Sequence, residues 1–128
     1  MVDSCDLSQS TKLSKILGDL GVDLIDISSA RLHPKQQVKM ETGYQSHFAK
    51  RIKDEVGDKL CITAVGAISN GTLAQQILDS GADAVMVGRA FQKNSGLVWT
   101  WAEELGVEIN VAKQILWAVP GGKVGWKR

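Results

Sequence analysis

Two glycines and one arginine have the types and spacing that predict a binding site. Gly66 follows the apolar segment Leu60–Val65, and Gly88-Arg89 follows the apolar segment Ala84–Val87. A glycine at a strand end lets the backbone approach a ligand, and the N–H groups that open the next helix attract anions. A guanidinium adds a forked, charge-assisted contact to phosphate oxygens. The pattern favours a phosphate site over the alternative, an ordinary strand-to-helix turn with a surface arginine.

Other polar residues near the predicted strands give weaker signals. Ser28-Ser29 follows the first strand and can either face a ligand or cap a turn. Asp26 lies inside an apolar strand, where a structural hydrogen bond is a better explanation than catalysis. His33 and His47 are not at metal-ligand spacing and have no identifiable partner. We therefore assign no catalytic residue and no metal ligand.

Helices and strands alternate along the sequence and must position these residues. Val22–Ile27 is almost continuously apolar, which predicts a parallel strand covered on both faces. Strands separated by helices predict right-handed parallel crossovers. Three such units are too few for a closed barrel, so the fold class is α/β, either a small open sheet or part of a (β/α)8 TIM barrel. The helices are predicted from four apolar faces: Leu13, Ile16, Leu17 and Leu20; Tyr44, Phe48, Ala49 and Ile52; Leu73, Ala74, Ile77 and Leu78; and Val98, Trp101, Ala102 and Leu105.

Two segments lie outside this alternation. Residues 28–42 form a basic loop, of a length that is often functional. No acidic residue follows Glu108, so we divide the chain into residues 1–110, the β/α part, and residues 111–128, an irregular basic tail.

Composition narrows the class of protein. The chain has 128 residues, 44% of them hydrophobic, and a net charge of +1, so neither nucleic acid nor a membrane is predicted as a partner. Cys5 and Cys61 form no disulfide framework or zinc pattern, and Cys61 is expected to be a small buried residue. No signal peptide or membrane span is recognised, which predicts a soluble protein of the cytoplasm.

Five segments together resemble the old yellow enzyme family of NADH:flavin oxidoreductases, which hold FMN in a (β/α)8 barrel. The similarity is greatest to its thermophilic-like fungal members. It extends over essentially the whole chain but only about the last third of the family's length. The segments are Leu20–Ser29, His33–Gln36, Gly43–Gln45, Ala64–Ile68 and Val87–Arg89.

The resemblance implies a role for each matching residue. The three strands would be the sixth to eighth of the barrel. Backbone groups of Gly66, Ala67 and Gly88, and both backbone and side chain of Arg89, would hold the FMN phosphate, with Ser29 nearby. The complete enzyme would use NAD(P)H to reduce an enone-type small molecule. The family's proton-donating tyrosine comes from an earlier strand, so Tyr44 does not match it, and we expect this chain to be inactive by itself. Ala30-Arg31 departs from the two glycines usual in the family.

Two alternatives stay open. One is a non-catalytic half-barrel that associates with another chain, for example as a homo-oligomer, through exposed strand edges. The other is a different phosphate-binding TIM barrel, because such barrels share a glycine after the seventh strand and Gly-Arg after the eighth. The serine pair and the His33–Gln36 segment favour the flavin enzyme. A truncated gene is also compatible with this length.

Overall fold

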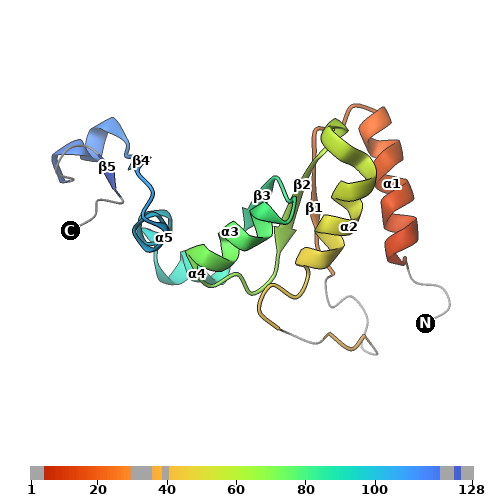
Figure 1. The fold of residues 1–128 in the computed structure, drawn as a ribbon, viewed down its shortest axis with the longest axis horizontal. Coiled ribbons are helices and arrows are strands. Elements are labelled where there is room, and N and C mark those ends of the chain that lie inside the picture. The colour runs from red at the N-terminus through yellow and green to blue at the C-terminus, as the bar shows by residue number, and fades with distance from the viewer. Residues whose placement is uncertain (1–4, 30–35, 39–40, 119–122, 125–128) are drawn as a thin grey trace.

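The computed structural model describes residues 5–29, 36–38, 41–118 and 123–124. Helices and strands alternate in it, as predicted, and in Figure 1 they extend in a row from α1 to the β4–β5 pair. The α-helices are α1 (Leu7–Asp19), α2 (Ser46–Val56), α3 (Gly71–Asp79), α4 (Arg89–Lys93) and α5 (Leu97–Leu105). The strands are β1 (Leu24–Ile27), β2 (Cys61–Val65), β3 (Ala84–Met86), β4 (Ile109–Asn110) and β5 (Lys123–Val124), and the 3-10 helices are η1 (Gly57–Lys59) and η2 (Lys113–Ala118).

Strands β1, β2 and β3 form one parallel sheet in chain order. Ile25 pairs with Ile62, and Ala64 pairs with both Ile27 and Val85. These apolar side chains share one face of the sheet, because residues in register point to the same side. The predicted parallel topology is therefore confirmed, with each strand starting or ending within two residues of its expected position.

The core lies between this face and helices α2 and α3. Ile62 and Ala64 of β2 are fully buried there, together with Ala49 and Ile52 of α2. Helix α3 contributes Ala74 and Ile77 from the apolar face that the sequence predicts. Burial of a side chain such as Ile52 stabilises the fold by about 1.5–3 kcal/mol. The carboxyl ends of the strands are thus anchored to a packed scaffold.

The opposite face of the sheet is largely uncovered by described residues, although Thr63 on this face is fully buried. Leu24 is 51% exposed and Met86 is 47% exposed, and Asp26 and Cys61 are also exposed. The expectations that β1 is covered on both faces and that Cys61 is buried are therefore wrong, because helices pack on one side only. An open sheet of this kind is the geometry of one sector of a barrel, whose inner face meets other strands.

Helix α1 begins with a capping box, and the face that it buries differs from its apolar stripe. Asp6 and Gln9 form a capping box, with Gln9 N donating to Asp6 Oδ1 at 2.8 Å. The helix buries Ser14, whereas Leu13 and Ile16 on the apolar stripe are each more than half exposed. Sequence periodicity locates a stripe, but it does not say whether a neighbour covers it.

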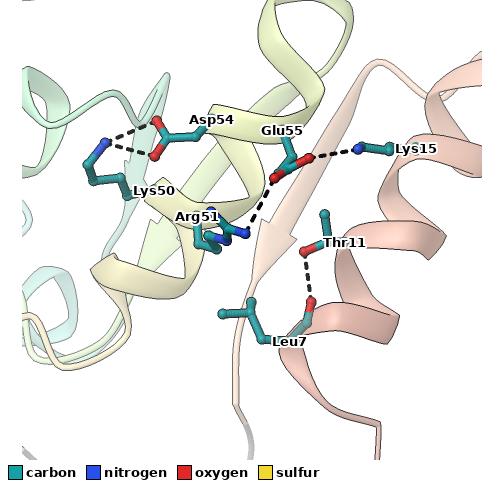
Figure 2. A network of polar contacts seen from close by, with 7 residues as sticks. All are labelled: Leu7, Thr11, Lys15, Lys50, Arg51, Asp54 and Glu55. Carbon is teal, nitrogen blue, oxygen red and sulfur yellow. Dashed lines mark hydrogen bonds and ion pairs between the residues drawn. The ribbon is translucent and has the colours of Figure 1, made fainter.

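Charged side chains join α1 to α2. Figure 2 shows Glu55 of α2 between Lys15 of α1, at 2.8 Å, and Arg51 of its own helix, at 3.4 Å. The hydrogen bond from Lys15 lowers the pKa of Glu55 below its usual value. Exposed ion pairs of this kind contribute little to stability. Their main effect is therefore on the orientation of α1 relative to α2.

Helix α5 packs on α3 at a glycine. Glu104 Oε2 accepts a hydrogen bond from Gly71 N at 2.7 Å, and so caps the first turn of α3. A Cβ at Gly71 would lie 3.0 Å from the Trp101 Cβ, which accounts for the small residue there. Trp101 packs against the core, as predicted.

The C-terminal segment contains a strand pair that the sequence does not predict. Strands β4 and β5 pair antiparallel, with Ile109 opposite Val124. Between them, Trp117 of η2 is 87% exposed. Within the described part of the chain, no helix has the length and apolar character needed to cross a membrane.

Candidate functional site

The predicted site residues lie at one edge of the sheet. Ser29 comes two residues after β1, Gly66 directly follows β2, and Gly88 comes two residues after β3. The three strands are parallel neighbours, so their carboxyl ends meet at the same edge. The structure therefore brings the predicted residues to one side of the molecule, while their role in binding stays a prediction.

The turn after β2 has an unusual backbone conformation. Gly66 has φ 121°, and Ala67 has φ 51°, the one positive φ of a non-glycine residue in the described part of the chain. A positive φ is costly for alanine, and such strain is common at functional sites. Two successive residues of this kind turn the chain sharply at the end of the central strand.

Tyr44 and Gln45 pack directly against this turn. A Cβ at Gly66 would lie 2.8 Å from Gln45 Nε2 and 2.9 Å from Tyr44 Cε1. Gln45 is only 3% exposed, and its Oε1 accepts a hydrogen bond from the backbone N–H of Ser29. Glycine at position 66 is thus required both by its φ and by its neighbours.

The turn after β3 is open. Gly88 has φ −97°, and nothing lies within 4 Å of the place where its Cβ would be. Arg89 begins the five-residue helix α4 and is exposed. No residue in the described ranges pairs with its guanidinium. Among the residues that the structure describes, Arg89 is therefore a cation without an ion-pair partner at the carboxyl edge of the sheet.

Three backbone donors at this edge have no acceptor within the described part of the chain. The N–H groups of Gly66, Ala67 and Gly88 donate to no residue that the structure describes. Backbone N–H groups seek an acceptor, which is either water or a ligand here. Unpaired N–H groups beside an arginine suit the oxygens of an anion such as phosphate. The donor set therefore fits a phosphorylated group.

Asp26 has the structural role predicted for it. Its Oδ1 accepts a hydrogen bond from Thr63 Oγ1 at 2.6 Å, across the β1–β2 pair. Thr63 is fully buried, so this bond satisfies its hydroxyl.

One of the remaining sequence candidates, His47, can be placed in the structure, on the exposed surface of α2. His47 is exposed and packs against the ring of Phe48, with centroids 3.9 Å apart. His33, Ala30 and Arg31 lie outside the described residues. A groove of about 260 Å³ between α1, α2 and η1 lies near the amino ends of the strands, away from this edge.

A charged pair at the amino edge escaped the sequence analysis. Asp83 accepts hydrogen bonds from Ile62 N at 2.7 Å and from Lys53 Nζ at 3.0 Å. Burial works to raise the pKa of Asp83, but these two hydrogen bonds outweigh it and hold the pKa below its usual value. The same bond raises the pKa of Lys53. The pair ties α2 to β2 and β3, which is a structural role.

Comparison with known proteins decides the family. Residues 4–115 match the family described as dihydrouridine synthase (Dus). The chain belongs to this family. Curated proteins that are similar in sequence to this chain are named as oxidoreductases. This confirms the resemblance to NADH:flavin oxidoreductases that the sequence indicates.

Three relatives give the extent of the match. An NADH:flavin oxidoreductase, FG08077, from Gibberella zeae is 46% identical over 129 residues, which cover 98% of this chain and 31% of that protein. An NADPH dehydrogenase from Bacillus cytotoxicus is 38% identical over 77% of this chain and 28% of its own length. The NADPH dehydrogenase of Bacillus subtilis is 33% identical over 81% of this chain and 30% of its own. The chain thus spans about a third of these relatives.

A solved structure confirms the fold class. The DHODH of Eimeria tenella, crystallised in complex with ferulenol, superposes with a TM-score of 0.62 at 14% identity. The superposition covers 95% of this chain and 34% of that TIM barrel. At this identity the likeness concerns the fold alone. The three parallel strands of this Dus-family chain are therefore a partial TIM barrel, as the sequence predicts.

Gln45 is the site residue that sequence reasoning missed. It lies in the segment Gly43–Gln45, which resembles the flavin oxidoreductases, but its residue type and position in the sequence predict no role. Its burial depends on the packing of α2 against the strand ends, which no local pattern reveals. A polar residue at the start of an otherwise apolar helical face is the one signal that the sequence offers.

Proposed function

We propose that this chain binds FMN through its phosphate at the carboxyl edge of β1, β2 and β3. The backbone N–H groups of Gly66, Ala67 and Gly88, and the N–H and guanidinium of Arg89, hold the phosphate, with Ser29 beside them. The observation that carries the proposal is that these N–H groups and the Arg89 guanidinium lie at one sheet edge and have no partner among the described residues. The flavin and nicotinamide named in the relatives support it.

The chain contributes binding and orientation rather than proton transfer. Bound FMN supplies the hydride chemistry for an NAD(P)H-dependent reduction of an activated C=C bond, such as that of an enone. The arginine and the turn donors neutralise and fix the phosphate, which positions the rest of the cofactor. We assign no catalytic side chain to these 128 residues. This placement corresponds to the sixth to eighth strands of an old yellow enzyme barrel.

Arg89→Ala tests the anchor. The substitution is expected to weaken FMN binding by about 1.5–3 kcal/mol, the value of a charged hydrogen-bonded contact. Flavin fluorescence titration measures the dissociation constant. Lys93→Ala, which removes an exposed cation from the same short helix, is the matched control and is expected to leave the affinity unchanged. An unchanged affinity in Arg89→Ala removes this residue from the site.

Turnover by the chain alone is expected to be negligible. The described strand ends provide phosphate donors, whereas a reductase also needs a proton donor and contacts to the reacting ring. The measurement is NADPH oxidation by the purified chain with FMN and an enone. Flavin-dependent oxidation well above a protein-free control contradicts the assignment of a binding role only.

Assembly with a second chain is the other candidate function. The uncovered face with Leu24 and Met86, and the exposed Leu13 and Ile16 of α1, are the observations that favour it. Apolar surface of this kind marks interaction sites in soluble proteins. Size-exclusion chromatography with light scattering separates the outcomes. A defined dimer supports a half-barrel that associates, and a stable monomer argues against it.

A further inference from the structure

The buried amide of Gln45 connects the ends of two strands. It lies at the residue before α2, where a side chain often caps its own helix, but it makes no such cap. Its Oε1 instead accepts the hydrogen bond from Ser29 N, after β1. Its Nε2 lies against Gly66, after β2. One side chain therefore touches both turns that flank the proposed phosphate site.

We propose that Gln45 is a positioning residue that sets the separation between the Ser28–Ser29 turn and the Gly66–Ala67 turn, and thereby shapes the phosphate site. This inference rests on the proposed function, since it assigns the support of that same site. Gln45 acts through the two turns, so it is distinct from the residues that contact the ligand.

The core holds Gln45 in place. Its backbone carbonyl accepts the hydrogen bond from Phe48 N at 3.0 Å, which starts α2. One turn further, Ala49 and Ile52 are fully buried against the sheet. The position of the amide is thus set by packed residues, and a site supported by such an element is held more precisely than one built on loops alone.

The bond to Gln45 also limits what Ser29 can offer. Its N–H is already donated to Gln45 Oε1, so the hydroxyl is the group that remains for a ligand. Ser29 is half-buried, which leaves that hydroxyl within reach of the sheet edge. A buried polar group needs its partner, so losing the acceptor would release the turn.

Gln45→Met is the decisive variant, because methionine has a similar length and no oxygen acceptor. The readout is phosphate selectivity, the ratio of the dissociation constants of riboflavin and FMN, measured by fluorescence on the whole 128-residue chain. We expect Gln45→Met to lower this ratio about tenfold, which is 1.4 kcal/mol. Glu104→Met is the matched control: it also removes a side-chain acceptor from a backbone N–H, that of Gly71, and is expected to keep the ratio.

The outcomes separate the two proposals. A folded Gln45→Met variant with wild-type selectivity overturns the positioning role and leaves the proposed function standing. A wild-type chain that binds FMN no better than riboflavin overturns the proposed function, and the positioning role with it. A loss of selectivity in both variants assigns the effect to stability and also overturns the inference.

Amide exchange provides a test that needs no variant. The Ser29 N–H of the wild-type chain is expected to exchange slowly without ligand, because Gln45 already accepts it, and to stay protected when FMN is added. An amide that exchanges freely in the ligand-free chain shows that the bridge does not form, and this overturns the proposal even where Gln45→Met fails to fold.

Discussion

Gly66→Ala is expected to lower the free energy of unfolding by about 2–5 kcal/mol. The first contribution is conformational, because φ 121° lies where alanine is strained. The second is steric, because the new Cβ would lie 2.8 Å from Gln45 Nε2 and 2.9 Å from Tyr44 Cε1. Gln45 is buried and Tyr44 is partly buried, so both side chains have limited room to move away from the new methyl group. Urea unfolding followed by circular dichroism measures the loss.

Gly81→Ala separates the two contributions. Gly81 has nearly the same φ, 116°, but nothing lies within 4 Å of its Cβ position. Its substitution is expected to cost only the conformational part, about 1–2 kcal/mol. Equal losses in the two variants mean that Tyr44 and Gln45 do not restrict the turn. In the proposed FMN site, Gly66→Ala is also expected to weaken binding, whereas Gly81→Ala is not.

Asp83→Ala is expected to lower the free energy of unfolding by about 2–4 kcal/mol. This is less than the cost of breaking a fully buried ion pair, because Asp83 is partly exposed. The substitution leaves Ile62 N–H without its acceptor and Lys53 without its 2.9 Å ion pair. Lys53 has only 14% of its side chain exposed, so water replaces the carboxylate poorly. Asp58, at 3.7 Å and fully exposed, is a weak substitute.

The pH dependence of this effect has a definite sign. The folded-state pKa of Asp83 is depressed, so its contribution is present above the unfolded value of about 3.9 and is lost as pH falls through the folded pKa. The pKa of Lys53 is raised, so its contribution is present below about pH 10.4 and is lost as pH rises through the folded pKa. Wild-type stability is therefore expected to fall below about pH 4 more steeply than that of Asp83→Ala.

Asp54→Ala is the control for Asp83→Ala. Asp54 pairs with Lys50 at 3.0 Å on the exposed surface of α2, with about half of each side chain accessible. An exposed pair of this type contributes about 0–1 kcal/mol. The same loss of stability in both variants contradicts a special role for Asp83. The role is also contradicted if the stability of Asp83→Ala falls as steeply below about pH 4 as that of the wild type.

The order of the strands and their glycine ends could be predicted from local pattern. The apolar segment Leu60–Val65 followed by Gly66 has the signature of a buried strand and a turn, and β2 ends at Val65. The capping box of Asp6 and Gln9 likewise depends on residues three apart. Each of these features is decided within a few residues, so the sequence contains all the information needed.

The environment of each face could not be predicted in this way. Leu13 and Ile16 have the helical spacing of core residues but are exposed, and Cys61 lies in an apolar strand but faces the uncovered side. Periodicity reports which residues share a face, whereas burial depends on whether another element covers that face. The antiparallel pairing of β4 and β5 was missed because two-residue strands have no usable period.

The sequence by itself determined the α/β order, the parallel topology and the placement of Ser29, Gly66 and Gly88 after three successive strands, because these depend on short-range pattern and on the geometry of parallel sheets. Only the tertiary structure decided that Gln45 bridges two of these turns, that Tyr44 packs behind Gly66, and that Asp83 pairs with Lys53. Those contacts join residues from 16 to 30 positions apart. These contacts form because α2 packs at a particular distance from the sheet. That distance depends on several segments together, so it cannot be predicted from any one of them.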